Sequence, residues 1–195
     1  MPRRLLTLTL TLAVALGAAL ALGGCEQRRV KEFKAAQSRL ATDPHALDGH
    51  FRANVTLCRT ISRKSGYPIG AGTEFEMREK SQVEALVEVA DVKPGETNMF
   101  HLVWIKPGEK EVFRRYAEVK VEPRESGYEA VIQWKKADDL HYLRTETQEV
   151  ETPSFRLEMS LDTSLKRDRE PGDWSFRVYF NRELLIEQPF TLSGA

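Results

Sequence analysis

The sequence has little of what would mark an enzyme. It contains no Gly-x-Ser-x-Gly elbow, no His-Glu-x-x-His motif and no phosphate-binding glycine loop. His101 and His141 stand apart from any serine or cysteine that would complete a triad. We therefore expect a protein that is not an enzyme and that holds no cofactor and no metal.

The chain also lacks an excess of charge of either sign. Its 29 Lys and Arg residues equal its 29 Asp and Glu residues. Loss of Arg3 and Arg4 with an amino-terminal leader would leave two acidic residues in excess. Such a balance gives no global electrostatic attraction to nucleic acid, so no nucleic-acid partner is expected. Hydrophobic residues make up 41% of the chain, which is enough for the core of one domain.

The first residues differ from the rest of the chain. Arg3 and Arg4 precede the stretch from Leu5 to Leu22, which carries no charge. A basic start, an apolar run and small residues at its end are typical of a secretory signal. Two other interpretations stay open. The 18 uncharged residues are long enough for an uncleaved transmembrane anchor. The same stretch also fits an ordinary secretory signal in which Cys25 is incidental.

The end of this stretch, Leu22-Gly23-Gly24-Cys25, resembles the lipobox of bacterial lipoproteins. The resemblance implies that residues 1–24 are a signal peptide, that the Cys25 thiol carries a diacylglycerol, and that the new amino group is acylated. Two or three acyl chains hold a protein to a bilayer far more firmly than one. A bacterial cell-envelope location is therefore expected. Glu26 stands where an inner-membrane retention signal has Asp, which favours the periplasmic face of the outer membrane in a diderm.

Residues 25–50 are predicted to be a membrane-proximal tether. Apolar and neutral residues recur there at roughly helical spacing, so a short helix is plausible. The same segment holds the best candidate metal ligands, Asp43, His45, Asp48 and His50. Metal sites need rigid, converging ligands, so we interpret these four residues as part of a solvated linker.

From residue 51 to 195 the pattern changes to the period of two that is typical of β-strands. Turn signals such as Pro94-Gly95 and Pro107-Gly108 separate most of the apolar runs. The run from Met99 to Lys106 is apolar on both faces and is therefore expected at the centre of a sheet. The polar segment 135–148 has no clear pattern. Eight strands are predicted, at Val55–Ile61, Ser81–Val92, Met99–Lys106, Val112–Val121, Tyr128–Trp134, Phe155–Leu161, Trp174–Asn181 and Leu184–Leu192.

The closing segment, Pro171–Phe180 followed by Leu184, Leu185 and Phe190, resembles the last hairpin of bacterial immunoglobulin-like envelope domains. The phrase from Phe100 to Gly108 resembles an earlier strand and turn of such domains. The resemblance implies an all-β, antiparallel, immunoglobulin-like sandwich of about seven or eight strands. Those domains usually have a small residue in the final turn, so Arg182 and Glu183 suggest a longer or different turn here.

Two further residues, Cys58 and Trp134, each allow a functional and a structural interpretation. With Cys25 acylated, Cys58 has no partner within the chain, and it is either a redox site or a small, half-buried residue. No neighbouring His or Cys-x-x-Cys motif supports reactivity, so the structural interpretation is favoured.

Trp134, beside Lys135 and Lys136, has the chemistry to stack on a sugar or a base. It shares a strand face with Ile132, so a core position is favoured.

These observations lead to two hypotheses about function. The first is a lipoprotein whose β-domain is a non-catalytic interaction or adaptor module for another envelope protein. The alternative is a small-ligand or glycan-binding lipoprotein. Its candidate contact residues are Tyr67, Tyr116, Tyr142 and Tyr179, which would have to gather around a concave pocket.

Overall fold

The computed structural model describes residues 45–47, 51–136, 141–164 and 170–194. The chain divides into two compact units, 1–43 and 44–195, and every described residue belongs to the second. Residues 1–24, Cys25, and Asp43, Asp48 and His50 of the candidate metal set lie outside the described residues.

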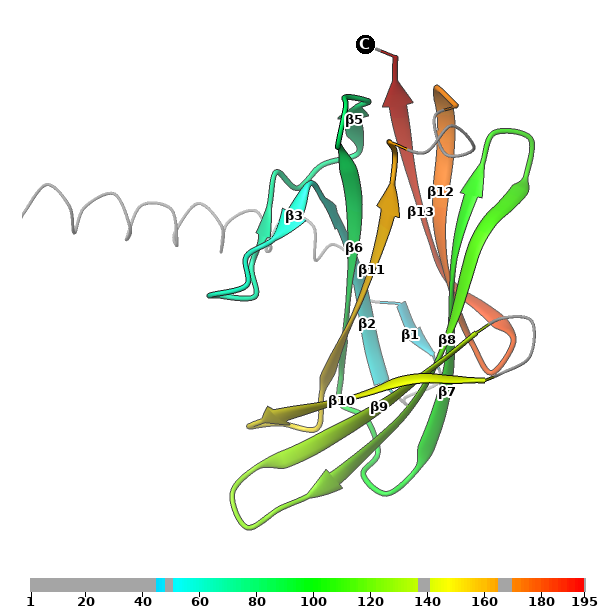
Figure 1. Ribbon diagram of the computed structural model, residues 1–195. Helices are drawn as coiled ribbons and strands as arrows, with labels where there is room; N and C mark the ends of the chain where they lie inside the picture. The colour runs from blue at the N-terminus through cyan, green and yellow to red at the C-terminus, as the bar shows by residue number, and fades with distance from the viewer. Residues whose placement is uncertain (1–44, 48–50, 137–140, 165–169, 195) are drawn as a thin grey trace, which may run out of the picture. The chain divides into compact units, whose positions relative to one another are not determined.

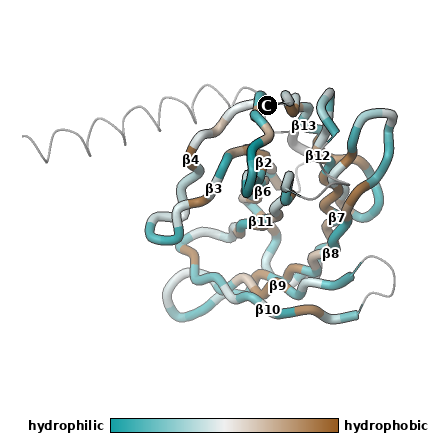
Figure 2. The backbone as a smooth tube through the Cα atoms, turned by 45° about the horizontal axis from the view of Figure 1, so that its top comes forward, coloured by the Kyte–Doolittle hydropathy of each residue, from teal (hydrophilic) through white to brown (hydrophobic). Residues whose placement is uncertain are grey.

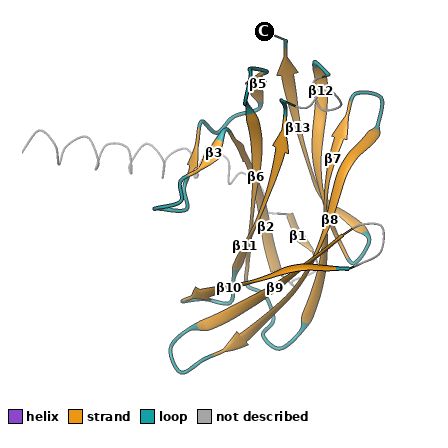
Figure 3. Ribbon diagram, in the orientation of Figure 1, coloured by secondary structure: helices purple, strands orange, loops and turns teal. Residues whose placement is uncertain are grey.

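The second unit is built from strands, and its described residues contain no helix (Figure 3). One sheet has four strands, all antiparallel. Its order is β1 (His45–Leu47), β2 (Phe51–Cys58), β6 (Gln82–Ala90) and β11 (Phe155–Asp162). The backbone of β1 pairs with β2, so residues 45–47 of the segment assigned to the tether belong to the sheet.

The second sheet has seven strands. Neighbouring strands are antiparallel except for the parallel pair at one edge. The order is β10 (Tyr142–Val150), β9 (Tyr128–Lys136), β8 (Lys110–Pro123), β7 (Thr97–Lys106), β12 (Gly172–Phe180), β13 (Glu183–Ser193) and β5 (Glu74–Glu76). A separate hairpin pairs β3 (Thr60–Ile61) with β4 (Pro68–Ile69). Figure 1 shows the two sheets facing each other, with β9 and β10 turning away across the end of β11.

The strand order is that of an immunoglobulin-like sandwich. In that fold the first, second and fifth strands share one sheet, while the third and the last two share the other. Here β2, β6 and β11 occupy the first set of positions, and β7, β12 and β13 occupy the second. β8 and β9 extend the sheet beyond β7, as the additional strands of variable-type domains do. The predicted fold class is therefore confirmed.

The core lies between the sheets and is rich in aromatic residues. Phe100 of β7 contacts Phe155 of β11 with 5.4 Å between ring centres, which joins the two sheets directly. Trp104 packs on Phe176 of the neighbouring strand at 4.5 Å. Figure 2 shows hydrophobic and hydrophilic residues alternating along the strands, as expected when one face fills the core. Trp134 is 3% exposed, in agreement with the predicted core position.

The last hairpin decides between the longer and the different turn that the sequence left open. β12 ends at Phe180 and β13 begins at Glu183, so the connection has only two residues rather than a longer loop. Asn181 and Arg182 both have positive φ, at 47° and 77°. Two positive φ values are the pattern of a type I′ turn, whose twist matches that of the flanking strands. Arg182 therefore holds a conformation that glycine adopts more readily.

Candidate functional site

Strand register places three rings side by side on the outer face of the seven-stranded sheet. Tyr179 of β12 pairs with His101 of β7, which in turn pairs with Tyr116 of β8. The His101 and Tyr116 ring centres lie 4.3 Å apart in an edge-to-face arrangement, and those of His101 and Tyr179 lie 6.5 Å apart. All three side chains are half-buried. Cross-strand neighbours of this kind stabilise a sheet while leaving ring surface for another molecule.

Two arginines adjoin these rings in the next row across the sheet. Arg177 of β12 and Arg114 of β8 both pair with Val103, which is completely buried although it faces outward. The arginine stems are the neighbouring groups placed to cover it, as long cationic side chains commonly do. Arg114 also lies over the ring of Tyr179, 5.9 Å from its centre. We call the set Tyr179, His101, Tyr116, Arg114 and Arg177 the outer-face patch.

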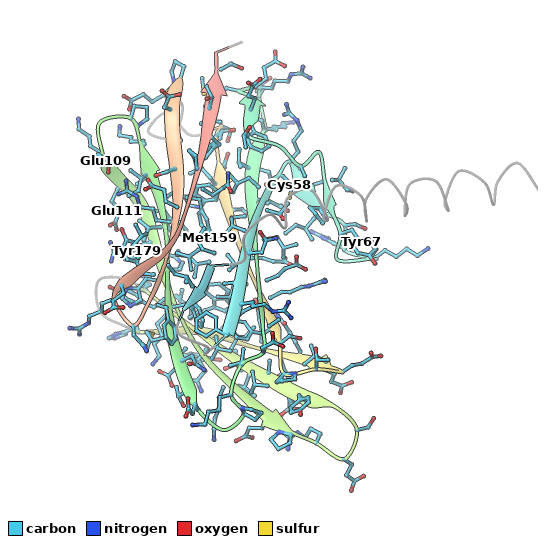
Figure 4. All side chains as sticks on the ribbon, turned by 180° about the vertical axis from the view of Figure 1, so that it is seen from behind. Cys58, Tyr67, Glu109, Glu111, Met159 and Tyr179 are labelled. Atoms are coloured by element: carbon cyan, nitrogen blue, oxygen red, sulfur yellow. The ribbon has the colours of Figure 1, made fainter. Side chains whose placement is uncertain are left out.

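Acidic residues hold the two arginines in place. Arg114 forms an ion pair with Glu111 at 2.6 Å. Arg177 pairs with Glu187 at 2.8 Å and with Glu109 at 2.6 Å. In Figure 4, Tyr179, Glu111 and Glu109 follow one another along one side of the domain. These ion pairs orient the two guanidinium groups on the outer face, and such orientation reduces the entropy that binding would cost.

The outer-face patch holds a neutral imidazole beside charged groups. Burial lowers the pKa of His101, and the positive charges of Arg114 and Arg182 lower it further. The imidazole is therefore neutral at pH 7. The hydrogen bond from Arg177 lowers the pKa of the Glu187 carboxyl, so that pair stays ionised.

The described residues contain no group of three or more His, Cys, Asp and Glu side chains able to hold a metal ion. The backbone of His45, a member of the candidate set, belongs to β1. Within the same described residues, no helix is long and apolar enough to cross a bilayer.

Cys58 is completely buried, rather than half-buried as expected. It faces away from the main core, because its neighbour Leu57 points inward and register pairs Cys58 with Glu84 on the outer side of β6. Burial, with Glu84 nearby, raises the pKa of the Cys58 thiol to about 11. The reactive thiolate is thus scarce at neutral pH, which agrees with the structural interpretation.

A cleft of about 400 Å³ opens where the edges of the two sheets part. Aromatic, apolar and charged side chains from β8, β9, β10 and β11 line it: Phe113, Arg115, Trp134, Leu143, Arg144, Glu158, Met159 and Ser160. The sequence patterns did not group these residues, because they lie on four different strands. In Figure 4, Met159 lies in the interior of the domain.

The four tyrosines proposed for ligand binding do not line this cleft. Tyr116 and Tyr179 belong to the outer-face patch, and Tyr142 lies in the same row at the sheet edge, beyond Lys135. Tyr67 is 43% exposed and lies on the opposite side of the domain from Tyr179 (Figure 4).

Fold and surface together define an immunoglobulin-like β-sandwich with an aromatic and arginine-rich outer face. No protein-family model matches the sequence, and no curated protein is significantly similar to it. Among solved structures, the chain is similar to an immunoglobulin-like protein from Pseudomonas aeruginosa. The two share 13% sequence identity with a TM-score of 0.38, over 76% of this chain and all of the other. The strand order itself identifies the sandwich as immunoglobulin-like.

Proposed function

We propose that the protein is a lipid-anchored lipoprotein of the bacterial cell envelope. In this proposal its β-sandwich is a non-catalytic interaction module that binds another envelope protein. The observation that carries the binding role is the outer-face patch, in which Tyr179, His101 and Tyr116 form one row flanked by Arg114 and Arg177. The signal-like start and the lipobox-like Leu22–Cys25 support the anchor and the location.

The composition of the patch supports protein binding for a physical reason. Tyrosine and arginine are enriched among the residues that contribute most to protein–protein affinity. A tyrosine ring offers a large contact area at a small cost in rotamer entropy, and its hydroxyl adds a hydrogen bond. Here the rings already pack against one another and the arginines are already paired, so the free surface is close to its bound form.

Site-specific photo-crosslinking in intact cells tests the binding role. A benzoylphenylalanine at position 179 should form one dominant protein adduct. The same probe at Arg52, which is exposed on the opposite sheet, should not form that adduct. Arg114→Glu in the Tyr179 probe strain should lower the adduct yield by about tenfold or more, because it places an acid beside the probe site. Arg78→Glu, a charge reversal at an exposed arginine of the β5–β6 loop, is the control and should change it little.

Two results would overturn this role. One is an adduct pattern at position 179 that is the same as the pattern at position 52. The other is an adduct that survives Arg114→Glu unchanged while the protein remains folded.

Metabolic labelling tests the anchor separately. Cells fed an alkyne-bearing fatty acid should transfer it to the wild-type protein and not to Cys25→Ser. The Cys25→Ser protein should also leave the membrane fraction. A wild-type protein that takes up no label, or a Cys25→Ser protein that stays in the membrane fraction, would instead favour an ordinary signal or a transmembrane anchor.

A further inference from the structure

The cleft between β10 and β11 exists because a side chain replaces strand pairing at its inner end. The amide of Gln148 in β10 accepts a hydrogen bond from the Arg156 backbone N–H at 2.9 Å and donates one to the Arg156 carbonyl at 2.8 Å. Beyond this point the two strands run apart at a wide angle (Figure 1). β11 is the edge of its sheet. Alternate residues of a β-strand direct their backbone N–H and C=O groups to the same edge. The backbone groups of Glu158 and Ser160 therefore point toward the β10 side of β11, as those of Arg156 do.

An irregularity in β10 shapes the outer wall of the cleft. The register between β9 and β10 shifts between Tyr142 and Arg144, which leaves Leu143 without a paired residue. Such bulges redirect side chains and occur often beside binding sites. Leu143 and Arg144 both line the cleft as a result, together with Phe113 and Met159. The cleft therefore combines apolar walls with a cationic rim.

Trp134 supplies the observation that points to a ligand. Trp134 lines the cleft and is 3% exposed, and its buried indole N–H has no hydrogen-bond acceptor among the described residues. Trp104 Nε1 and Ser175 Oγ are unsatisfied in the same way, but neither residue lines the cleft. A buried donor without an acceptor is unfavourable and calls for an explanation. The guanidinium of Arg144 lies over the Trp134 ring, 5.6 Å from its centre. Trp134 thus combines, at the wall of the cleft, a buried unsatisfied donor with a cation over its ring.

The charges in the cleft favour an anionic ligand. Arg115 and Arg144 contribute two positive charges, and Glu158 is the one acidic residue of the lining. Arg144 also forms an ion pair with Glu146, which holds it near the cleft while 62% of its side chain stays exposed. Burial, with Glu84 and Glu146 nearby, raises the pKa of Glu158, so its negative charge is disfavoured.

We propose that this cleft binds a small amphipathic carboxylate. Its apolar body lies against Phe113, Leu143 and Met159, and its carboxylate pairs with the Arg144 guanidinium above the Trp134 ring, where a small shift of that ring would also bring the buried indole N–H within hydrogen-bond reach. A volume of about 400 Å³ falls within the range of pockets that hold small organic molecules. This site is separate from the outer-face patch and does not depend on the proposed protein partner.

Fluorine NMR on the full chain, labelled with fluorotryptophan and held in detergent micelles, tests the proposal. The three tryptophans give three signals, which single Trp→Phe variants assign. Phenylpropionate, a water-soluble aryl carboxylate, is the probe, and phenylpropanol is its neutral counterpart. Phenylpropionate should shift the Trp134 signal in a saturable way. The Trp174 signal should stay in place, because that indole N–H already donates to the Glu170 carbonyl at 2.7 Å.

Two matched variants separate the cleft from general charge effects. Arg144→Gln should weaken phenylpropionate binding by about tenfold or more, because it removes a charge-assisted hydrogen bond. Arg78→Gln is the control, because Arg78 also pairs with a glutamate two residues away. Arg78 follows β5, at the opposite edge of the large sheet from β10, so this change should alter the affinity for phenylpropionate by less than about twofold. The absence of a saturable Trp134 shift would overturn the proposal. Equal responses to the acid and the alcohol, or unchanged affinity in Arg144→Gln, would also do so.

Discussion

His101 and Tyr116 pack edge to face on the outer side of the large sheet, with 4.3 Å between their ring centres. This contact partly buries an imidazole that also has Arg114 and Arg182 as cationic neighbours. All three effects disfavour the protonated ring. The same packing that builds the outer-face patch therefore makes the stability of the domain sensitive to acid.

The pH dependence has a definite sign. The unfolded imidazole takes up a proton near pH 6.5, whereas the lowered pKa of folded His101 delays uptake to lower pH. Between these values the unfolded state binds more protons, so the free energy of unfolding falls as pH falls below about 6.5. Urea unfolding at pH 7.5 and 5.5 measures this loss. His101→Phe, which keeps a ring but does not titrate, should show a smaller loss, and an equal loss would contradict the prediction.

Arg182→Gly should stabilise the domain. Arg182 has φ 77° in the two-residue turn between β12 and β13. An L-residue in the left-handed region costs roughly 1 kcal/mol that glycine avoids, and the Asn-Gly sequence is preferred in type I′ turns. Chemical denaturation should therefore give a gain of up to about 1 kcal/mol, partly offset by the greater entropy of the unfolded glycine chain. A clear loss of stability would mean that Arg182 makes a contact whose stabilising free energy exceeds the cost of its positive φ.

Gly127→Ala should be strongly destabilising. A Cβ at this position would meet the Val150 carbonyl oxygen at 2.5 Å, and the φ of 80° is unfavourable for alanine. Gly95→Ala is the matched control, since its φ of 85° is similar but nothing lies within 4 Å of the added carbon. The control isolates the backbone cost of about 1 kcal/mol, and Gly127→Ala should exceed it by about 1 kcal/mol or more. Equal losses in the two variants would show that β10 moves aside freely.

Cys58 should be protected from alkylation in the folded protein. Its side chain is completely buried, and burial raises the pKa of the thiol to about 11. In the Cys25→Ser chain it is the one remaining cysteine. A maleimide at pH 7 should label it only at the rate at which the domain unfolds, and rapidly in denaturant. Fast labelling without denaturant would indicate that the β3–β4 hairpin opens independently and would revive the redox interpretation.

The sequence predicted the central strand well and the edge strand poorly, for one physical reason. β7 is apolar on both faces, and Val103 and Ile105 are indeed buried on the outer side as well. β10 escaped prediction because an edge strand with mostly exposed side chains has no apolar period to detect. The sequence left a longer and a different turn open after Phe180, because Asn181 and Arg182 reveal their positive φ only in the folded hairpin.

The candidate sites depend on contacts between strands, which local sequence patterns cannot predict. Tyr116 and Tyr179 were singled out individually, but only strand register places His101 between them. Trp134 was correctly predicted to be buried, because it shares a face with Ile132. Its position in a cleft depends on the bulge before Arg144 and on the bonds of Gln148, which are tertiary features.

The position of β13 has a consequence for biogenesis. This strand lies between β12 and β5, and its parallel pairing with β5 joins segments more than a hundred residues apart. The large sheet is therefore incomplete until residues 183–193 are available. For a polypeptide threaded through a secretion channel, as the proposed export requires, this order of assembly delays folding until almost the whole sandwich has crossed. The topology itself would then keep the passing chain in an export-competent state.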